Sequence, residues 1–124
     1  MSYKKSLDKI IVKYRNKYMF IPTTDKQSCA VSNNGVIILN VDEWKSPDAF
    51  FVFTVLHEIG HCETYQKGQY KVKREYLATQ WAIDNSKEWN VKLKSSEQKR
   101  WQEYIYSFSK AKDKSKYKLN WCNM

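Results

Sequence analysis

The sequence predicts an α+β fold in which an N-terminal helix is followed by a small, mostly antiparallel sheet and then by three helices. Three observations support this order. Apolar residues at helical spacing open the chain, β-rich segments flank Asn34-Gly35, and longer helical patterns fill the remainder. With 124 residues the chain suits one modest core. We expect one domain over residues 1–109 and a frayed basic tail over residues 110–124.

The helix and the strands occupy the first third of the chain. Apolar residues recur every three or four positions over residues 5–17, which predicts an amphipathic helix. The segment YMFIP predicts a short strand that stops at Pro22, because proline cannot donate to a ladder. The run SCAVSNNGVIILNV predicts a hairpin with a tight turn at Asn34-Gly35 and a second strand over residues 36–41.

A buried helix is predicted next. Ser46 suits the N-cap, Pro47 the first helical position and Asp48 the positive end of the helix dipole. Apolar residues surround most of this helix, so we expect it to be central and to end near residues 66–68.

Two more helices complete the predicted fold. One spans residues 72–89, and the last begins at Ser95, with Gln98 completing a capping box.

The bulk composition excludes several classes of protein. No apolar run approaches the roughly 18–20 residues that span a bilayer, so we expect no membrane insertion. The N-terminus does not resemble a signal peptide. Three cysteines without CxxC spacing favour reduced thiols and a cytoplasmic location.

The net charge of +9 is the unusual bulk property. It is compatible with attraction to nucleic acid or to an acidic protein partner. A lysine-rich solvated surface explains it as well, and we favour that reading because arginine is scarce. Weak nucleic-acid contact through the basic tail remains an alternative.

The only two histidines of the chain lie four residues apart in FTVLHEIGHCE. On a helix, His57 and His61 share a face and can hold one metal ion, while Glu58 can hydrogen-bond a metal-bound water as general base. The spacing therefore predicts a catalytic metal site. Gly60, inside the motif, would leave room for another element to pass close to the metal.

A third ligand must be a carboxylate or a thiolate, because no histidine remains. Glu75 is the favoured candidate, since it shares a helix face with small residues that allow two helices to approach closely. Asp84 and Glu88 are the fallback ligands. Cys62 follows His61 on another face of the helix, and we expect a small buried side chain rather than a ligand or redox thiol.

Three segments together resemble the ImmA/IrrE-like zinc metallopeptidases of bacteria, prophages and mobile elements. They are GVIILN, FTVLHEIGH and EYLATQWAID, and the resemblance covers residues 35–84. It implies a zincin-like fold, Zn²⁺ held by His57, His61 and Glu75, and Glu58 as catalytic base. The Leu-Met-Pro element usual in the family is absent, as is an appended sensor domain, so the chain resembles a minimal, phage-type member.

The resemblance implies a protein substrate, often a helix-turn-helix repressor or an antitoxin. A substrate strand would add to a sheet edge formed by Val36, Ile37, Ile38, Leu39 and Asn40. An oxyanion stabiliser is expected besides zinc, and Tyr65, Tyr70 and Tyr76 are candidates. The alternative is a zincin-fold binding protein in which the metal is structural or vestigial and which binds a repressor or DNA without proteolysis. A nucleic-acid-directed zinc protease would need a third histidine, which the chain lacks.

Overall fold

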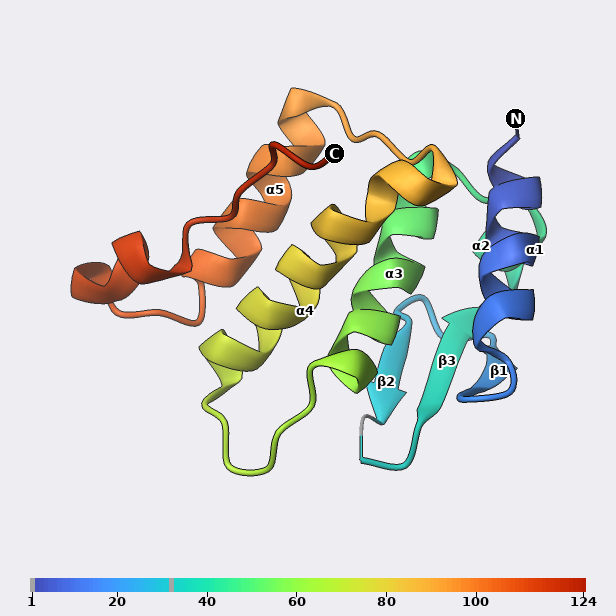
Figure 1. Ribbon diagram of the computed structural model, residues 1–124, viewed down its shortest axis with the longest axis horizontal. Helices are drawn as coiled ribbons and strands as arrows, with labels where there is room; N and C mark the ends of the chain where they lie inside the picture. The colour runs from blue at the N-terminus through green and yellow to red at the C-terminus, as the bar shows by residue number, and fades with distance from the viewer. Residues whose placement is uncertain (1, 32) are drawn as a thin grey trace.

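A computed structural model describes residues 2–31 and 33–124 and confirms the α+β class. A three-stranded sheet packs against α3 (Ala49–Glu63), and α4 (Lys71–Ser86) packs along the same helix away from the sheet (Figure 1). Helix α1 (Tyr3–Tyr14) also contacts α3, while α5 (Ser95–Tyr106) contacts α4. Helix α3 is thus central, as its apolar sequence predicts. Within the described ranges, we find no helix with the length and apolar character needed to cross a membrane.

The sheet is mixed rather than mostly antiparallel. Its strands are β1 (Met19–Thr23), β2 (Cys29–Val31) and β3 (Val36–Asn40), in the spatial order β1-β3-β2. Strand β1 pairs in parallel with β3, and β2 pairs antiparallel with β3. Pro22 lies inside β1 instead of ending it, which an edge strand tolerates because one side of its backbone needs no ladder partner.

The predicted hairpin between β2 and β3 is present, but its turn is longer than expected. Val31 lies opposite Val36, so four residues connect the strands, of which Ser32 lies outside the described residues. Gly35 has a φ of +66°, in the left-handed region that glycine adopts without strain. Beyond this turn, Ile37 and Leu39 alternate into the core.

A short helix that was not predicted, α2 (Val41–Lys45), follows β3 directly. The Asn40 side chain caps it by accepting a hydrogen bond from the Glu43 N–H at 2.9 Å. The Asn40 amide also donates to the carbonyl of Asp25 at 2.7 Å. These two bonds fix the end of the strand at Asn40, one residue earlier than predicted.

Helix α3 begins two residues later than predicted, because Asp48 and not Ser46 is its N-cap. The Asp48 carboxylate accepts a hydrogen bond from the Phe51 N–H at 2.8 Å. The helix ends at Glu63, before the expected residues 66–68, and the Thr64 hydroxyl closes the last turn by donating to the carbonyl of Gly60 at 2.7 Å.

The last helices agree more closely with the sequence. Helix α4 and the 3₁₀ turn η1 (Lys87–Trp89) cover the predicted residues 72–89. Helix α5 begins at Ser95, but Lys94 is its N-cap. In place of the predicted capping box with Gln98, the carboxylate of Glu97 accepts from the Lys94 N–H at 2.9 Å, and the lysine side chain accepts nothing in return.

The C-terminal segment is docked instead of frayed. After η2 (Ala111–Tyr117), Leu119 is 4% exposed. Gln80 of α4 and Asn120 exchange two hydrogen bonds of 2.9 Å. Gln102 of α5 binds the backbone on both sides of residue 118, at 3.0 and 2.7 Å. The basic segment therefore ties α4 to α5 and belongs to the fold (Figure 1).

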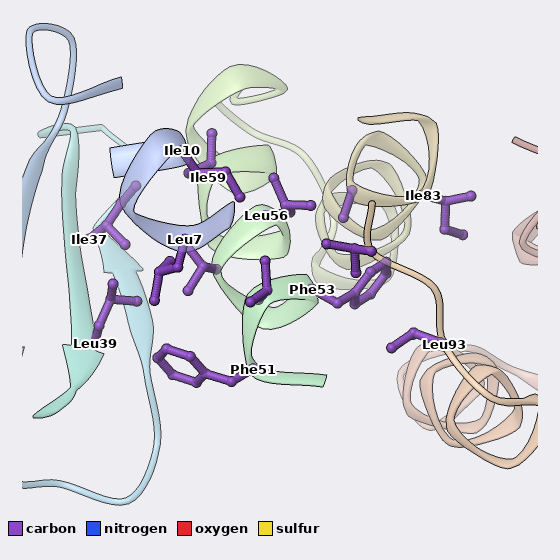
Figure 2. Packing of buried hydrophobic residues seen from close by; sticks show 14 of the residues in the cluster. Leu7, Ile10, Ile37, Leu39, Phe51, Phe53, Leu56, Ile59, Ile83 and Leu93 are labelled. Carbon is purple, nitrogen blue, oxygen red and sulfur yellow. The ribbon is translucent and has the colours of Figure 1, made fainter. Parts of the chain in front are cut away.

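The core is built around α3 (Figure 2). On the sheet side, Leu7 and Ile10 of α1 and side chains of β3 lie beside Ile59, whereas Leu56 points toward α4. The other side of α3 meets α4 and the segment before α5. The labelled residues that fill this second side are Phe53, Ile83 and Leu93.

Candidate metal centre

Helices α3 and α4 approach so closely that backbone meets backbone at Gly60. A Cβ added to Gly60 would lie 2.5 Å from the carbonyl oxygen of Ala78, which is shorter than side chains tolerate. Ala78 and Ala82 are fully buried on the same face of α4 as Glu75. The small residues predicted to allow a close helix approach therefore do so, and they bring Glu75 to the histidines.

His57, His61 and Glu75 form one cluster of ligand atoms. Their ligand atoms all lie within 4.8 Å of one another. Oε2 of Glu75 lies 3.8 Å from Nε2 of His57 and in direct contact with Nε2 of His61. Oε1 of Glu58 lies 3.7 Å from Nε2 of His57, beside this cluster and outside it. The structure thus brings together all four residues that the sequence singled out.

Thr79 orients His57. Its hydroxyl donates to the carbonyl of Glu75 at 2.7 Å, and its oxygen lies 3.0 Å from Nδ1 of His57. Because a hydroxyl has one hydrogen, this network assigns the imidazole hydrogen to Nδ1. Nε2 of His57 is then left with a free lone pair on the side of Glu75. Thr79 is on the helix face of Glu75, and the sequence analysis assigned it no role.

The residues present fit a metal ion. Oε2 of Glu75 is buried beside the Nε2 atoms of both imidazoles, and it accepts no hydrogen bond of regular geometry from the described residues. A buried acceptor without a donor calls for an explanation, and a cation between it and the imidazoles provides one. Two imidazoles and one carboxylate are a ligand set that divalent metals accept, with room for a further ligand.

Burial sets the protonation states of His57 and Glu58. Burial and the neighbouring His61 lower the pKa of His57 to about 3, against the opposing charge of Glu75. The imidazole is therefore neutral near pH 7, as a metal ligand must be. Burial and the charge of Glu75 raise the pKa of Glu58 to about 8. A carboxyl with its pKa near neutrality can both take up and release a proton.

Tyr104 of α5 holds Glu75 from the opposite side. Its hydroxyl donates to Oε1 of Glu75 at 2.5 Å. Burial would raise the pKa of Glu75, but contact with His61, electrostatic interaction with the two imidazoles and the Tyr104 hydroxyl together lower it to about 2. Burial and the bond to Glu75 raise the pKa of Tyr104, so its hydroxyl stays a donor.

Two hollows meet at the cluster. One, of about 490 Å³, is lined by His57, Phe50 and Trp101, and the other, of about 320 Å³, by His61 and Glu75. Glu58, Tyr104 and residues 27–28 line both hollows. We call the two hollows together the groove. His61 is the more exposed histidine, with 17% of its side chain accessible against 4% for His57, so the cluster opens toward the groove at His61.

The fallback ligands lie away from the cluster. Asp84 is exposed and bonds Gln80 and Asn123. Glu88 pairs with Lys13 at 3.1 Å. Among the described residues, neither joins the group of candidate ligands.

The Cys62 thiol does not join that group either. It packs against the core, and burial and the charges of Glu58 and Glu63 raise its pKa to about 11. The side chain is half-buried, whereas a buried one was expected.

The three candidate tyrosines do not line the groove. Tyr65 and Tyr70 are exposed, and Tyr76 packs against Tyr117. Tyr104 takes the place beside the cluster that was expected for one of them. The only sequence signal for it was its position on the inner face of α5, between Trp101 and Ile105.

The predicted substrate edge is wrong, because β3 is the central strand. Val36–Asn40 pairs with β1 on one side and with β2 on the other, so its backbone has no free edge. The edge beside the cluster belongs to β2, and Cys29 and Ala30 of this strand line the groove together with His61.

These features define an α+β protein with a two-histidine, one-carboxylate cluster held between two helices and open to a groove. Comparison of the chain with family models, curated proteins and solved structures finds no match.

Proposed function

We propose that this protein is a zinc-dependent peptidase with a zincin-like fold that hydrolyses a peptide bond in a protein substrate. One observation carries the proposal. Glu58 stands beside the His57, His61 and Glu75 cluster without belonging to it, on the wall shared by both hollows of the groove. A purely structural metal site has no use for a free, buried carboxyl at its open side.

Each residue of the site has a role in this proposal. A zinc ion, when bound, supplies Lewis acidity toward water and toward the peptide carbonyl. His57, His61 and Glu75 are its ligands. Glu58 would take a proton from the attacking water and give it to the leaving amine, from its place 3.7 Å from Nε2 of His57. The Tyr104 hydroxyl lines the groove and donates its one hydrogen to Glu75, so it positions this ligand.

An extended substrate would lie in the groove along the edge of β2. The outer side of this strand has no strand partner in the described part of the chain, so its backbone is free to pair with a peptide. Such pairing would carry the peptide past Glu58 and His61, which line the groove with Cys29 and Ala30.

The resemblance to ImmA/IrrE-like peptidases supports a repressor or an antitoxin as the substrate. It also supports a cytoplasmic setting, and the three free cysteines agree with a reducing compartment.

The metal and the chemistry are tested with separate variants. We expect the wild-type protein and Glu58→Gln to bind one zinc per chain, and His57→Ala and Glu75→Gln to lose it. Asp84→Asn and Glu88→Gln are matched controls on the same helical segment, and they should keep full zinc content.

Cleavage of a co-expressed repressor should then be lost in Glu58→Gln. The alternative function, a metal-containing protein that binds a repressor without cutting it, predicts that the cellular effect survives this substitution. Intact substrate together with a surviving effect would therefore reject the peptidase.

A further inference from the structure

The two ends of the groove carry the same chemistry. Lys26 and Arg100 line the hollow beside His57, and Lys71 and Arg74 line the hollow beside His61. Each pair lies on a different side of the catalytic group, so an extended chain passing Glu58 would meet positive charge before and after the reacting bond.

None of these four cations is neutralised within the protein. Among the described residues, the ion pairs involve other lysines and the histidines, and no carboxylate lies within 4.0 Å of the four side chains. Glu43 is the one further acidic residue on the wall, in the hollow beside His57. Cations without partners that line a concave surface attract an anionic ligand more strongly than the same charges on a flat surface.

Two of the cations are held over aromatic rings. The Arg100 guanidinium lies 4.8 Å from the ring centre of Phe50, and the Lys71 ammonium lies 4.8 Å from that of Phe108. Cation–π contacts of this length restrain the charged groups without neutralising them. The cost of ordering these side chains on binding is correspondingly smaller.

The hollow beside His57 also has an aromatic wall. The rings of Phe50 and Trp101 stack with centres 5.8 Å apart, and Trp101 lies against His57 with ring centres 4.8 Å apart. A volume of about 490 Å³ accommodates a large side chain, and a rigid aromatic wall favours an apolar or aromatic one.

From these observations we infer that the groove selects an acidic peptide segment, with carboxylates on both sides of a large apolar residue that enters the hollow beside His57. This inference rests on the proposed peptidase function and specifies its substrate class. Lys26 and Arg100 bind the carboxylates on one side, and Lys71 and Arg74 bind those on the other.

Binding is measured on zinc-loaded Glu58→Gln, so that the readout does not depend on hydrolysis. The probe is a fluorescein-labelled decapeptide with two Asp residues on each side of a central Phe-Ala pair. Its control has Asn at the four Asp positions, which keeps the shape and removes the charge. At low salt we expect about fivefold or more tighter binding of the Asp peptide, and the difference should shrink as salt is added.

Charge reversal locates the interaction. Arg100→Glu, Lys26→Glu and Lys71→Glu should each weaken binding of the Asp peptide by about fivefold and leave the Asn peptide unaffected. Lys9→Glu, on α1 and outside the groove lining, changes the net charge equally and should have little effect. If Arg100→Glu proves unstable, Lys26→Glu tests the same hollow. Because Lys26 is exposed, its substitution does not disturb the core.

Three results would overturn the inference. The first is equal binding of the Asp and Asn peptides, and the second is an equal loss of affinity in Lys9→Glu, which would indicate general attraction. The third is tighter binding of a single-stranded oligonucleotide that is abolished by Arg100→Glu. If Glu58→Gln binds the Asp peptide selectively but the wild type does not cleave it, the peptidase function is rejected and the acidic-peptide groove is kept. If the wild type cleaves neutral peptides alone, the peptidase function is kept and the acidic-peptide groove is rejected.

Discussion

The hydroxyl oxygen of Thr79 lies 3.0 Å from Nδ1 of His57 and connects the two helices that hold the candidate metal ligands. Thr79 is fully buried on α4, one helical turn after Glu75, and its hydroxyl hydrogen is used by the carbonyl of Glu75. One side chain therefore fixes the tautomer of a ligand on α3 and the backbone of a ligand on α4. Such partners of metal-binding histidines orient the ring and raise its basicity.

Replacement of Thr79 by valine should weaken zinc binding by about 10–100-fold, the usual effect of losing a partner of a ligand. Valine keeps the shape of the side chain but leaves Nδ1–H of His57 without an acceptor. Thr79→Ser retains the hydroxyl and should bind zinc nearly as tightly as the wild type. Competition with a chromophoric chelator measures both affinities, and equal affinities for valine and serine would show that the bond is dispensable.

Gly60→Ala should destabilise the protein by about 1–3 kcal/mol, because its Cβ would meet the backbone carbonyl of Ala78 and a backbone cannot rotate away. In an isolated helix the same change would stabilise by about 0.8–1 kcal/mol, so a loss identifies the contact between helices. Since α4 must shift, zinc affinity should fall as well. Urea unfolding and zinc titration provide the two measurements.

Gly68→Ala is the matched control for this prediction. Gly68 has a φ of +85° and open space where its Cβ would be, so alanine there costs only backbone strain. It should lower stability by about 1 kcal/mol and leave zinc affinity unchanged. A zinc affinity that falls equally in both variants would contradict the proposed reason.

The metal-free protein should lose stability as the pH falls from about 4.5 toward 3, because between pH 6.5 and 4.5 the contributions of His57 and Glu58 oppose each other. The pKa of His57 is about 3 in the folded state against 6.5 in the unfolded chain, so the unfolded chain takes up the proton first. The stabilising contribution of His57 is complete above pH 6.5 and is lost as the pH decreases toward its folded-state pKa of about 3. Glu75, with its pKa lowered to about 2, adds a loss of the same sign below pH 4.5.

In His57→Asn, stability should instead increase as the pH falls from 6.5 to 4.5, because asparagine can donate to Thr79 but does not titrate, and only the contribution of Glu58 remains. Glu58 acts in the opposite direction: its pKa is raised to about 8, so its contribution is complete below pH 4.5 and is lost as the pH rises through 8. Glu58→Gln should therefore steepen the acid side. Urea unfolding in the presence of a chelator, at several pH values, measures these slopes, and identical slopes in all three proteins would refute the assignment.

The candidate ligands could be predicted because their geometry is local. His57 and His61 are four residues apart on one helix, and Glu75 lies on the one face of α4 that is made of small residues. The partners of these ligands could not be predicted as readily. Tyr104 reaches Glu75 only because α5 docks across α4, and no spacing within α5 encodes that docking.

The same distinction between local contacts and contacts among separate elements explains where the predicted fold was wrong. The hairpin of β2 and β3 is local and was recognised, but the parallel pairing of β1 with β3 joins strands far apart in the chain. The substrate edge was misassigned for this reason, since β1 covers the side of β3 that was expected to be free. In the C-terminal segment, Leu119 and Trp121 stand among lysines, and the composition concealed two residues that pack on the core.

Removal of residues 118–124 should destabilise the protein by about 2–4 kcal/mol, within the range of large truncations in a core. The deletion removes the buried Leu119 and the ring of Trp121, whose centre lies 6.1 Å from that of Phe53. It also leaves Gln80 without its two backbone partners. Thermal unfolding measures the effect, and an unchanged transition temperature would mean that this segment is not docked in solution.

Because the fold depends on residues 118–124, nucleic-acid binding by the basic segment must be tested without deleting them. Deletion would also disturb α4 and α5. A loss of binding could then result either from the missing lysines or from the disturbed fold. Neutralisation of the exposed Lys112, Lys114 and Lys116 by glutamine removes charge from η2 and leaves Leu119 in place. If this segment contacts nucleic acid, the triple variant should keep its transition temperature and lose affinity for an oligonucleotide, with a shallower salt dependence. If affinity is unchanged, the lysines only provide a solvated surface.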